Sequence, residues 1–514
     1  MNSERARRAI FRDGLFWRVK PIDQLIAGAE KKALRRSLGP MQLTLFGVGT
    51  VIGTGIFVLT AEAAQKAGPG MMISFTIAAA VCAVAALCYA EIASMVPVAG
   101  SAYTYSYAVL GEHIAWLVGW ALILEYAVAG SAVAVGWSGY AVGLVENLFQ
   151  TEFAVQWTRG PEDGGLLNLP AALLTITVTL LLLVGTRESV YVNSVLVIVK
   201  LLALAIFIAL TIPVLKLENF EPFAPLGFAG ISAAAGSIFF AYIGFDAVST
   251  AAEETRNPQR NVPIGLLGSL LVCTIFYLLV AAGVTGTVGA QPLMIEGVAP
   301  RPGSIEMTKA CFSQPSEILV CSREGLAFTL REIGWPHAAN LLGLAVGLAL
   351  PSVVLLVIYG QSRIFFVMAR DGLLPSVFAK IHARWETPHV VTMFTGIIVA
   401  TFAALLPLGR LADISNAGTL FAFLAVSFAA IVLRVKDPTR HRPFRAPGLW
   451  FVAPAAIAGC IYLFWSLGSD TKWMFAGWTV VGIATYAMYG YRKSHLGRGI
   501  VEPEVSPAPV PGTQ

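Results

Sequence analysis

Three ionisable residues of this sequence lie inside long apolar stretches, where charge is costly: Glu125, Lys200 and Asp246. A charged side chain in hydrocarbon costs at least ~2.5–3.5 kcal/mol on insertion scales, so each residue indicates a function until another reason is found. Lys200 follows Tyr191, the expected inner end of its apolar helix, by about 13 Å of helix. Burial disfavours the charged amine, so this lysine could bind and release a proton near neutral pH. The alternative is a side chain that reaches back to the membrane interface.

The two carboxylates allow similar pairs of interpretations. Glu125 lies near the middle of the apolar stretch 112–148. It is either a structural carboxylate that is hydrogen-bonded to neighbouring helices, or an anion in a cavity that meets an amino or cationic group of a substrate. Asp246 could do the same, or it could act in gating or cap the lower half of the helix that contains it.

Glycine interrupts two of the apolar stretches. The segment GVGTVIGTGIF (47–57) has glycines at 47, 49, 53 and 55, and each weakens a helix by about 1 kcal/mol relative to alanine. It is either a close helix–helix contact face or an unwound stretch around Gly53, Thr54 and Gly55 whose free N–H groups meet an anion. The segment FFAYIGFDAV (239–248) holds Gly244 in a corresponding position of a second set of helices. Paired interrupted helices of this kind indicate a transporter built from inverted repeats.

Composition and hydropathy predict the elements that must position these residues. Hydrophobic residues make up 56% and charged residues 13% of the chain, against roughly 25% charged in an ordinary soluble domain. We therefore expect an all-α integral membrane protein, because about 20 apolar residues cross the hydrocarbon layer as a helix. Twelve transmembrane helices are predicted at 42–65, 72–95, 112–148, 168–184, 191–213, 231–252, 264–288, 340–368, 389–407, 413–434, 449–467 and 473–490.

The distribution of positive charge predicts the orientation. Most of the 35 Lys and Arg residues fall in segments that share the side of the N-terminus, so the positive-inside rule predicts that both termini are cytoplasmic. We expect a multi-pass protein of the cell (inner) membrane without a cleavable signal peptide. Its parts would be a cytoplasmic segment (1–40), a transporter domain (41–491) and a disordered cytoplasmic tail (492–514).

Further charged residues lie near the expected inner ends of the spans. These residues are Glu91, Glu253, Glu254 and Arg363. They could form ion pairs of an inner gate or remain ordinary interfacial charges. Arg256 and Arg260, in a polar inner turn, could pair with the acids among them.

The six cysteines divide into two groups. Cys82, Cys88, Cys273 and Cys460 lie within apolar spans and are expected to be core residues. Cys311 and Cys321 share the long outer segment between the seventh and eighth spans, where a disulfide and two free thiols are both open.

No pattern in the sequence indicates an enzyme. Its six histidines are scattered without metal-ligand spacing, and no GxxxxGK[ST] phosphate loop is present, which argues against an ATP-driven pump. We expect no cofactor and no metal, with H⁺ as the coupling ion. The net charge of +5 follows from the membrane orientation and needs no nucleic-acid partner.

Several blocks in order give the chain a specific resemblance. From about Leu34 to Tyr491 it resembles the cationic amino acid transporter family of the amino acid–polyamine–organocation superfamily, including its bacterial proton-coupled members. The blocks that carry the resemblance are GTVIGTGIFVLT (49–60), AGPG (67–70), ALCYAEIASMVPVAGSAYTYSY (86–107), GWALILEY (119–126), the segment 239–266, YGQSRIFFVMARDGLLP (359–375) and NAGTLFAF (416–423).

The resemblance implies a LeuT-type fold with five plus five helices in inverted repeats, about 41–213 and 231–434, and two additional helices in 449–490. It implies that Lys200 replaces the sodium ion of sodium-driven relatives and ties the fifth helix to the first and eighth. It also implies a substrate site. The carboxylate would bind at Ile52, Gly53, Thr54 and Gly55, the amino group at carbonyls near Phe240 and Ile243, and the side chain near Glu125, Val357 and Ile358.

The substrate class remains open at this stage. Ala121 stands where many relatives have a polar or acidic residue, and together with Val357 and Ile358 it would let a small neutral amino acid compete with cationic ones. The chain also departs from the resemblance in its outer segment at roughly 295–323, which looks longer than in close bacterial relatives, so the family predicts no structure for it. The prediction is proton-coupled symport of cationic and/or small neutral L-amino acids by alternating access. The alternatives are an exchanger of amino acids or polyamines, and a membrane sensor that binds amino acids without moving them. Expected partners are the substrate and membrane lipids, and a small accessory membrane subunit could also bind.

Overall fold

The computed structural model describes residues 18–23, 38–96, 101–185, 190–302, 304–313, 318–382, 385 and 387–499, apart from the side chains of residues 190–193, 250, 253 and 254. Most of the predicted N-terminal segment and tail, and the side chains of Glu253 and Glu254, therefore lie outside the described residues. Within the described part, the regular structure is helical, with two isolated bridges at Leu38–Thr255 and Ile295–Val298. The all-α prediction is confirmed.

The α-helices of the described chain differ widely in length. In order they are α3 (Pro40–Val51), α4 (Thr54–Phe57), α5 (Leu59–Ala67), α6 (Met71–Met95), α7 (Ser101–Val109), α8 (Glu112–Phe149), α9 (Val155–Thr158), α10 (Leu169–Val184), α11 (Val190–Thr211), α12 (Gly227–Ile238), α13 (Ala247–Thr250), α14 (Pro258–Val288), α15 (Ile305–Ser313), α16 (Gly325–Glu332), α17 (Pro336–Arg370), α18 (His389–Leu405), α19 (Leu408–Lys436), α20 (Leu449–Ser466), α21 (Ser469–Thr485) and α22 (Tyr491–Lys493).

Among the described residues, eight helical segments are long and apolar enough to cross a membrane. The first predicted span is not one of them, because its residues are divided among α3, α4 and α5. Helices α10 and α18 are apolar but shorter, with 16 and 17 residues. The chain is thus a multi-pass helical protein, while the number of twelve spans and the two five-helix repeats remain predictions. The eight segments are Leu59–Met95, Glu112–Phe149, Ser194–Val214, Gly227–Ser249, Pro258–Val288, Pro336–Arg370, Leu408–Lys436 and Leu449–Ser466.

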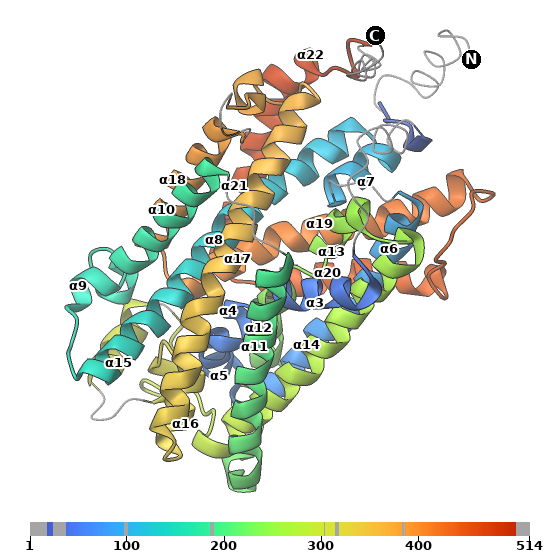
Figure 1. Cartoon of the computed structure of the whole chain (residues 1–514). Helices are drawn as coiled ribbons and strands as arrows, with labels where there is room; N and C mark the ends of the chain where they lie inside the picture. The colour runs from blue at the N-terminus through green and yellow to red at the C-terminus, as the bar shows by residue number, and fades with distance from the viewer. Residues whose placement is uncertain are drawn as a thin grey trace.

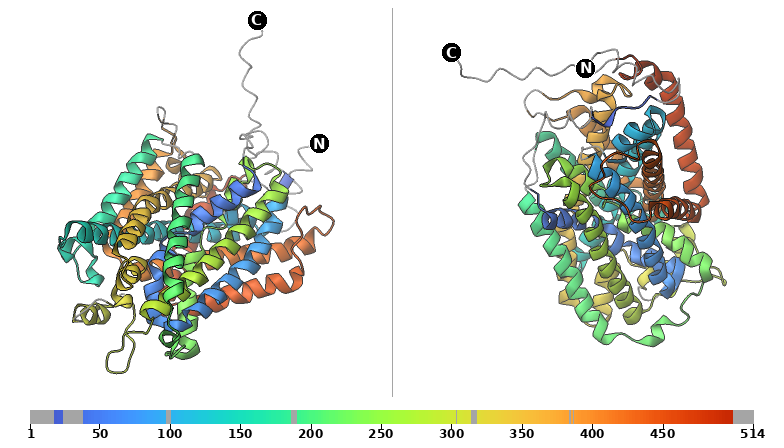
Figure 2. Two further views of the ribbon diagram at one scale, coloured as in Figure 1. Left: turned by 60° about the horizontal axis from the view of Figure 1, so that its bottom comes forward. Right: turned by 90° about the vertical axis from the view of Figure 1, so that its right-hand side faces the viewer.

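Two groups of helices form the centre of the bundle. The long helix α8 packs against α17 and α19, while α14 packs against α3 and α6 (Figure 1). Helix α11 lies beside α3, α14 and α17, whereas α20 and α21 lie at the edge of the bundle (Figure 2). This packing surrounds the short segments α4, α5, α12 and α13 with long helices.

The described ends of the chain meet at one end of the bundle. Arg18 donates a hydrogen bond to the carbonyl of Tyr491 at 3.4 Å. Its guanidinium carbon also lies 4.7 Å from the centroid of the Tyr491 ring, in a cation–π contact. Helices α9, α15 and α16 lie at the opposite end (Figure 1). This agrees with an even number of crossings, whereas the orientation of the bundle in the membrane remains a prediction.

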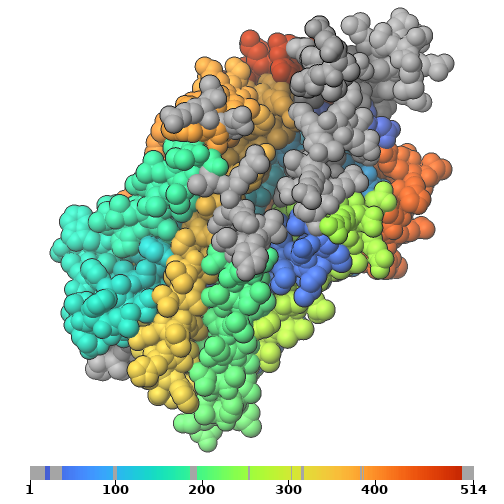
Figure 3. All heavy atoms as spheres, viewed as in Figure 1, coloured from blue at the N-terminus to red at the C-terminus, as the bar shows by residue number. Residues whose placement is uncertain are grey.

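Apolar side chains cover much of the outside of the bundle. Helices α10, α11 and α17 reach the surface in Figure 3, and each carries exposed leucine or isoleucine residues. Phe451 on α20 and Trp473 on α21 are 84% and 78% exposed. A soluble protein rarely exposes contiguous apolar surface on this scale, so hydrocarbon is the solvent that suits these helices.

The two cysteines between α14 and α17 form a disulfide. Cys311 in α15 is bonded to Cys321, with their Cα atoms 5.6 Å apart. The structure therefore decides between the two alternatives that the sequence left open. Cys82, Cys88, Cys273 and Cys460 are free and buried, as predicted for core residues.

Candidate substrate site between two interrupted helices

The first interruption lies at Ile52 and Gly53. Helix α3 ends at Val51, Ile52 and Gly53 have extended backbone, and α4 begins at Thr54. The predicted break is confirmed, but Thr54 and Gly55 form the first turn of the next helix and are not unwound. N–H groups in a first helical turn have no partner within the helix, so they remain able to bind an anion.

The second interruption lies at Ile243 and Gly244. Helix α12 continues into a 3₁₀ turn at Phe239–Tyr242, and a short helix resumes at Ala247. Gly244 has φ +109°, a conformation that L side chains rarely adopt. A Cβ atom on Gly244 would also lie 2.9 Å from the carbonyl oxygen of Thr50. Glycine is therefore required here by both backbone conformation and space.

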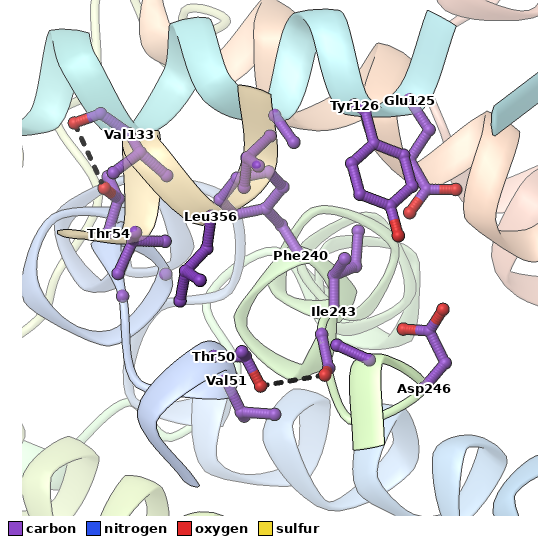
Figure 4. Close-up of a pocket in the computed structure, with 17 residues that line it drawn as sticks. Thr50, Val51, Thr54, Glu125, Tyr126, Val133, Phe240, Ile243, Asp246 and Leu356 are labelled. Atoms are coloured by element: carbon purple, nitrogen blue, oxygen red, sulfur yellow. Dashed lines mark hydrogen bonds between the residues drawn. The ribbon is translucent and has the colours of Figure 1, made fainter. Parts of the chain in front are cut away.

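The two interruptions are in direct contact. A Cβ atom on Gly55 would lie 2.3 Å from the Cα of Ala241, so these two backbones touch. The Thr50 hydroxyl donates a hydrogen bond of 2.9 Å to the carbonyl of Gly244 (Figure 4). Each broken helix thus supplies a partner to the other.

Tyr277 of α14 serves both interruptions at once. Its hydroxyl lies 3.0 Å from the carbonyl oxygen of Val51 and 2.9 Å from that of Ala241. Since a hydroxyl has one proton, the two carbonyls share it. The side chain is fully buried, and its ring packs against Phe75 and Tyr242. The sequence analysis did not identify Tyr277, because one tyrosine in an apolar helix carries no local signal.

Lys200 supplies a hydrogen-bond donor to another backbone carbonyl near the first interruption. Lys200 is 2% exposed, and its ammonium donates a hydrogen bond of 2.9 Å to the carbonyl of Gly49. Gly49 belongs to the last turn of α3, where carbonyls lack partners within the helix. The helix that carries Lys200, α11, packs against both α3 and α17. The predicted tie from the fifth span to the first is therefore present, and the helix of the eighth span is adjacent.

A cavity of about 90 Å³ lies between the interruptions and the helices α8 and α17. Figure 4 shows Thr54 and Val133 at one end of it and Glu125, Tyr126 and Asp246 at the other. Its lining consists of Thr50, Val51, Gly53, Thr54, Gly55, Glu125, Tyr126, Ala129, Val133, Phe240, Ile243, Gly244, Asp246, Ala247, Val353, Leu356 and Val357.

Most of the predicted site residues line this cavity. They are Gly53, Thr54, Gly55, Glu125, Phe240, Ile243, Asp246 and Val357. Ile52 and Ile358 are fully buried, but neither is among the lining residues. Ile358 follows Val357 by one residue, which turns its side chain about 100° around α17.

The apolar wall of the cavity was missed by sequence reasoning. Ala129 and Val133 come from α8, and Val353 and Leu356 come from α17. Spacings of three and four residues place such side chains on one face of a helix. The signal was therefore present, but every apolar span contains such faces, and only the packing of α8 against α17 selects these two.

Two carboxyl groups share the cavity. Glu125 is 3% exposed, and among the described residues its Oε2 has no hydrogen-bond partner. Asp246 is the residue before α13, and the Ser101 hydroxyl donates to its carboxylate at 3.4 Å. A buried charge without a partner is costly, so this end of the cavity suits a proton, water or a cationic group.

The charged residues that the sequence predicts near the inner ends of the spans differ in their contacts. Glu91 is buried and pairs with Arg434 and with Arg442, the latter at 3.3 Å, and it accepts a hydrogen bond from the Ala446 N–H at 2.8 Å. It thus joins α6 to the end of α19 as an ion pair. Arg363 instead lies over the ring of Tyr359 at 4.7 Å, in the manner of an interfacial charge.

Comparison with known proteins agrees with this geometry. A family model described as "Amino acid permease" matches residues 38–487. The chain is 42% identical to the branched-chain amino acid permease BcaP of Bacillus subtilis, over 94% of this chain and all of that protein. It is 39% identical to the methylthioribose transporter of the same organism, over 94% of this chain and 99% of that protein. It is 35% identical to the vacuolar cationic amino acid transporter 4 of Arabidopsis thaliana, over 82% of this chain and 67% of that protein.

Proposed function

Because the chain belongs to the amino acid permease family, a family of transporters and not of enzymes, we propose that it is a proton-coupled symporter of L-amino acids that works by alternating access. The observation that carries this proposal is the cavity between two interrupted helices, with the first-turn backbone of α4 on one side and an apolar wall on the other. Such a site at the junction of two broken helices is typical of secondary transporters. The surplus of Lys and Arg in the inner segments supports cytoplasmic termini.

The backbone ends of the substrate would bind to the two interruptions. The carboxylate would accept hydrogen bonds from the N–H groups that begin α4, at Gly53, Thr54 and Gly55. The amino group would donate to carbonyls of the second interruption, near Phe240 and Ile243. Ile52 and Ile358 would act from behind the lining, by holding the extended segment and α17 in place.

The side-chain pocket supports an aliphatic substrate. Ala129, Val133, Val353, Leu356 and Val357 offer apolar contacts and no hydrogen-bonding side chain. Burying a side chain of the valine or leucine type against them gains roughly 1.5–3 kcal/mol. One of the relatives is named as a branched-chain amino acid permease, which agrees with this preference. We therefore favour neutral aliphatic amino acids, from alanine to leucine.

A second substrate class is supported by Glu125 and Asp246. A lysine or arginine side chain that extends to this end of the cavity would meet two carboxyl groups, one of which has a buried oxygen with no hydrogen-bond partner in the described part of the chain. Another relative is named as a cationic amino acid transporter. Cationic substrates thus remain the second candidate.

Proton coupling would act through Lys200. In its charged form the ammonium binds the Gly49 carbonyl and steadies α3 next to the first interruption. Loss of the proton would weaken this bond, since charge-assisted hydrogen bonds are about twice as strong as neutral ones. Proton release and movement of α3 would thereby be linked.

An uptake panel would test the proposal. Purified protein in liposomes would be offered radiolabelled alanine, valine, leucine, lysine and arginine, with imposed proton or sodium gradients. We expect accumulation driven by protons, with aliphatic substrates preferred. Counterflow from preloaded liposomes without any pH dependence would instead indicate an exchanger, and binding without uptake would indicate a sensor.

A further inference from the structure

A second cluster of charged side chains lies outside the lining of the cavity, where α5, α12 and α19 meet. Lys66 of α5 forms an ion pair with Glu62 at 2.7 Å and with Asp413 of α19 at 3.6 Å. Its ammonium also donates to the Ser237 hydroxyl of α12, which in turn donates to Asp413 at 2.5 Å. These four residues are called the outer cluster below.

The outer cluster is largely withdrawn from solvent. The side chains of Lys66, Glu62 and Asp413 are 17%, 10% and 14% exposed. Breaking a buried ion pair leaves an uncompensated charge, so the contact persists only while the three helices stay together. It is therefore unlike an exposed surface pair, which contributes little.

The outer cluster lies between the cavity and the end of the bundle that carries the disulfide. Ser237 precedes the cavity residue Phe240 by three positions, about 5 Å along the chain. Next to Lys66 in the last turn of α5, Gln65 donates hydrogen bonds to the carbonyls of Leu293 and Pro300, at 3.0 and 3.1 Å. The segment that holds these carbonyls leads to Cys311. The outer cluster thus adjoins the second interruption through Ser237 and this segment through Gln65, the neighbour of Lys66.

The outer cluster joins both interrupted helices to α19. Helix α5 continues from the first interruption, and α12 leads into the second. A Cβ atom on Gly230 of α12 would lie 2.4 Å from the Lys66 carbonyl, so α5 and α12 are in contact. Asn416 extends the attachment of α19 by donating to the carbonyls of Gly236 and Ser237, at 2.8 and 3.1 Å.

We propose that Lys66, Glu62, Ser237 and Asp413 form the outer gate of the transporter. The gate is closed while the Lys66 ammonium bridges α5 to α12 and α19, and it opens when α5 and α12 move together away from α19. This rests on the proposed alternating access, because a protein that binds without moving its substrate needs no gate on this side.

Thiol labelling would test the gate without depending on transport. Ala129, which lines the cavity, would be changed to Cys, and a membrane-impermeant thiol reagent would be added to intact cells and to inside-out vesicles. The parent protein, whose four free cysteines are buried, gives the background. We expect Asp413→Asn to raise the labelling rate at position 129 in intact cells at least about fivefold, since a single broken buried pair can shift such an equilibrium by more than that. The rate in inside-out vesicles should not rise.

Two further variants keep the test decisive. Ser237→Ala removes only one hydroxyl of the outer cluster and should raise labelling in the same direction; it alone decides the outcome if Asp413→Asn does not fold. Arg410→Gln is the matched control, because it removes the more exposed pair with Glu162 near the same end of α19 and should leave labelling unchanged. Unchanged labelling in folded variants of the outer cluster, or a rise only in inside-out vesicles, would overturn the gate.

The gate and the proposed function fail separately. Uptake by the parent protein in liposomes reports the function, whereas labelling requires no transport. Uptake with unchanged labelling in the variants would remove the gate alone. Absent uptake with raised labelling would remove symport and leave a cavity that opens on this side.

Discussion

The ammonium of Lys200 lies 2.9 Å from the carbonyl oxygen of Gly49, four residues before Gly53 in the first interrupted helix. In an unbroken helix that carbonyl would accept from the N–H of residue 53. The extended backbone at Ile52 and Gly53 removes this donor, and a charged side chain from another helix takes its place. A titratable group thus completes the helix end beside the cavity.

Replacement of Lys200 by alanine should abolish proton-driven accumulation. The variant leaves the Gly49 carbonyl unpaired and has no proton to exchange, so uptake under an imposed pH gradient should fall to background. Exchange of substrate at equal pH should persist, because the cavity itself is unchanged. Lys216→Ala, at an exposed lysine, is the matched control and should accumulate normally. Full accumulation by Lys200→Ala would exclude this lysine as the coupling residue.

Glu125→Gln should distinguish the two substrate classes. A hydrogen bond to a charged group contributes about 1.5–3 kcal/mol, so affinity for arginine and lysine should fall roughly tenfold or more. Affinity for alanine and leucine should change much less. Competition with a radiolabelled neutral substrate measures both, and Glu146→Gln, at the less buried end of the same helix, is the control. Equal losses for all substrates would indicate a structural role for Glu125.

Gly55→Ala should destroy the site through contact alone. The added methyl would lie 2.3 Å from the Cα of Ala241, a backbone atom that can move only with its helix. Overpacking of this kind costs about 1–3 kcal/mol, and here it would force the interruptions apart. We expect loss of binding by scintillation proximity assay. Gly347→Ala on α17, where the methyl meets no atom of the described residues within 4 Å, should bind normally and controls for the substitution itself.

Tyr277→Phe should weaken binding while the bundle stays folded. It removes one hydroxyl from the carbonyls of Val51 and Ala241, and an unpaired buried group costs about 1–3 kcal/mol. KM should rise roughly tenfold with a smaller change in the maximal rate, because the hydroxyl holds together the two interruptions that form the binding site. Uptake kinetics at several substrate concentrations separate the two effects, and an unchanged KM would contradict this assignment.

Mass spectrometry after alkylation, which counts the reactive thiols, tests the disulfide between Cys311 and Cys321. Alkylation of the denatured protein without reductant should modify only the four free cysteines, and prior reduction should raise the number to the full six of the chain. In Cys311→Ser, five thiols should react whether or not reductant is present. Six modified cysteines in the unreduced protein would show that Cys311 and Cys321 are free thiols in the cell.

Local properties of the sequence determined the helical class and the positions of both interruptions. Hydropathy is a property of about 20 neighbouring residues, and a glycine such as Gly244 affects its own backbone conformation. Both features can therefore be predicted without knowing which helices pack together. The same reasoning identified Glu125, Lys200 and Asp246, because a charge in an apolar stretch is costly wherever the stretch packs.

Only the tertiary structure decided which groups meet. Tyr277 lies more than thirty residues along the chain from either carbonyl with which it forms a hydrogen bond. Lys66 and Asp413 form an ion pair although they are far apart in the sequence. The apolar wall of the cavity exists because α8 packs against α17, and Cys311 joins Cys321 because the chain between α14 and α17 folds back on itself. Such pairings depend on how helices pack against one another, and no periodicity within a single helix specifies its neighbours.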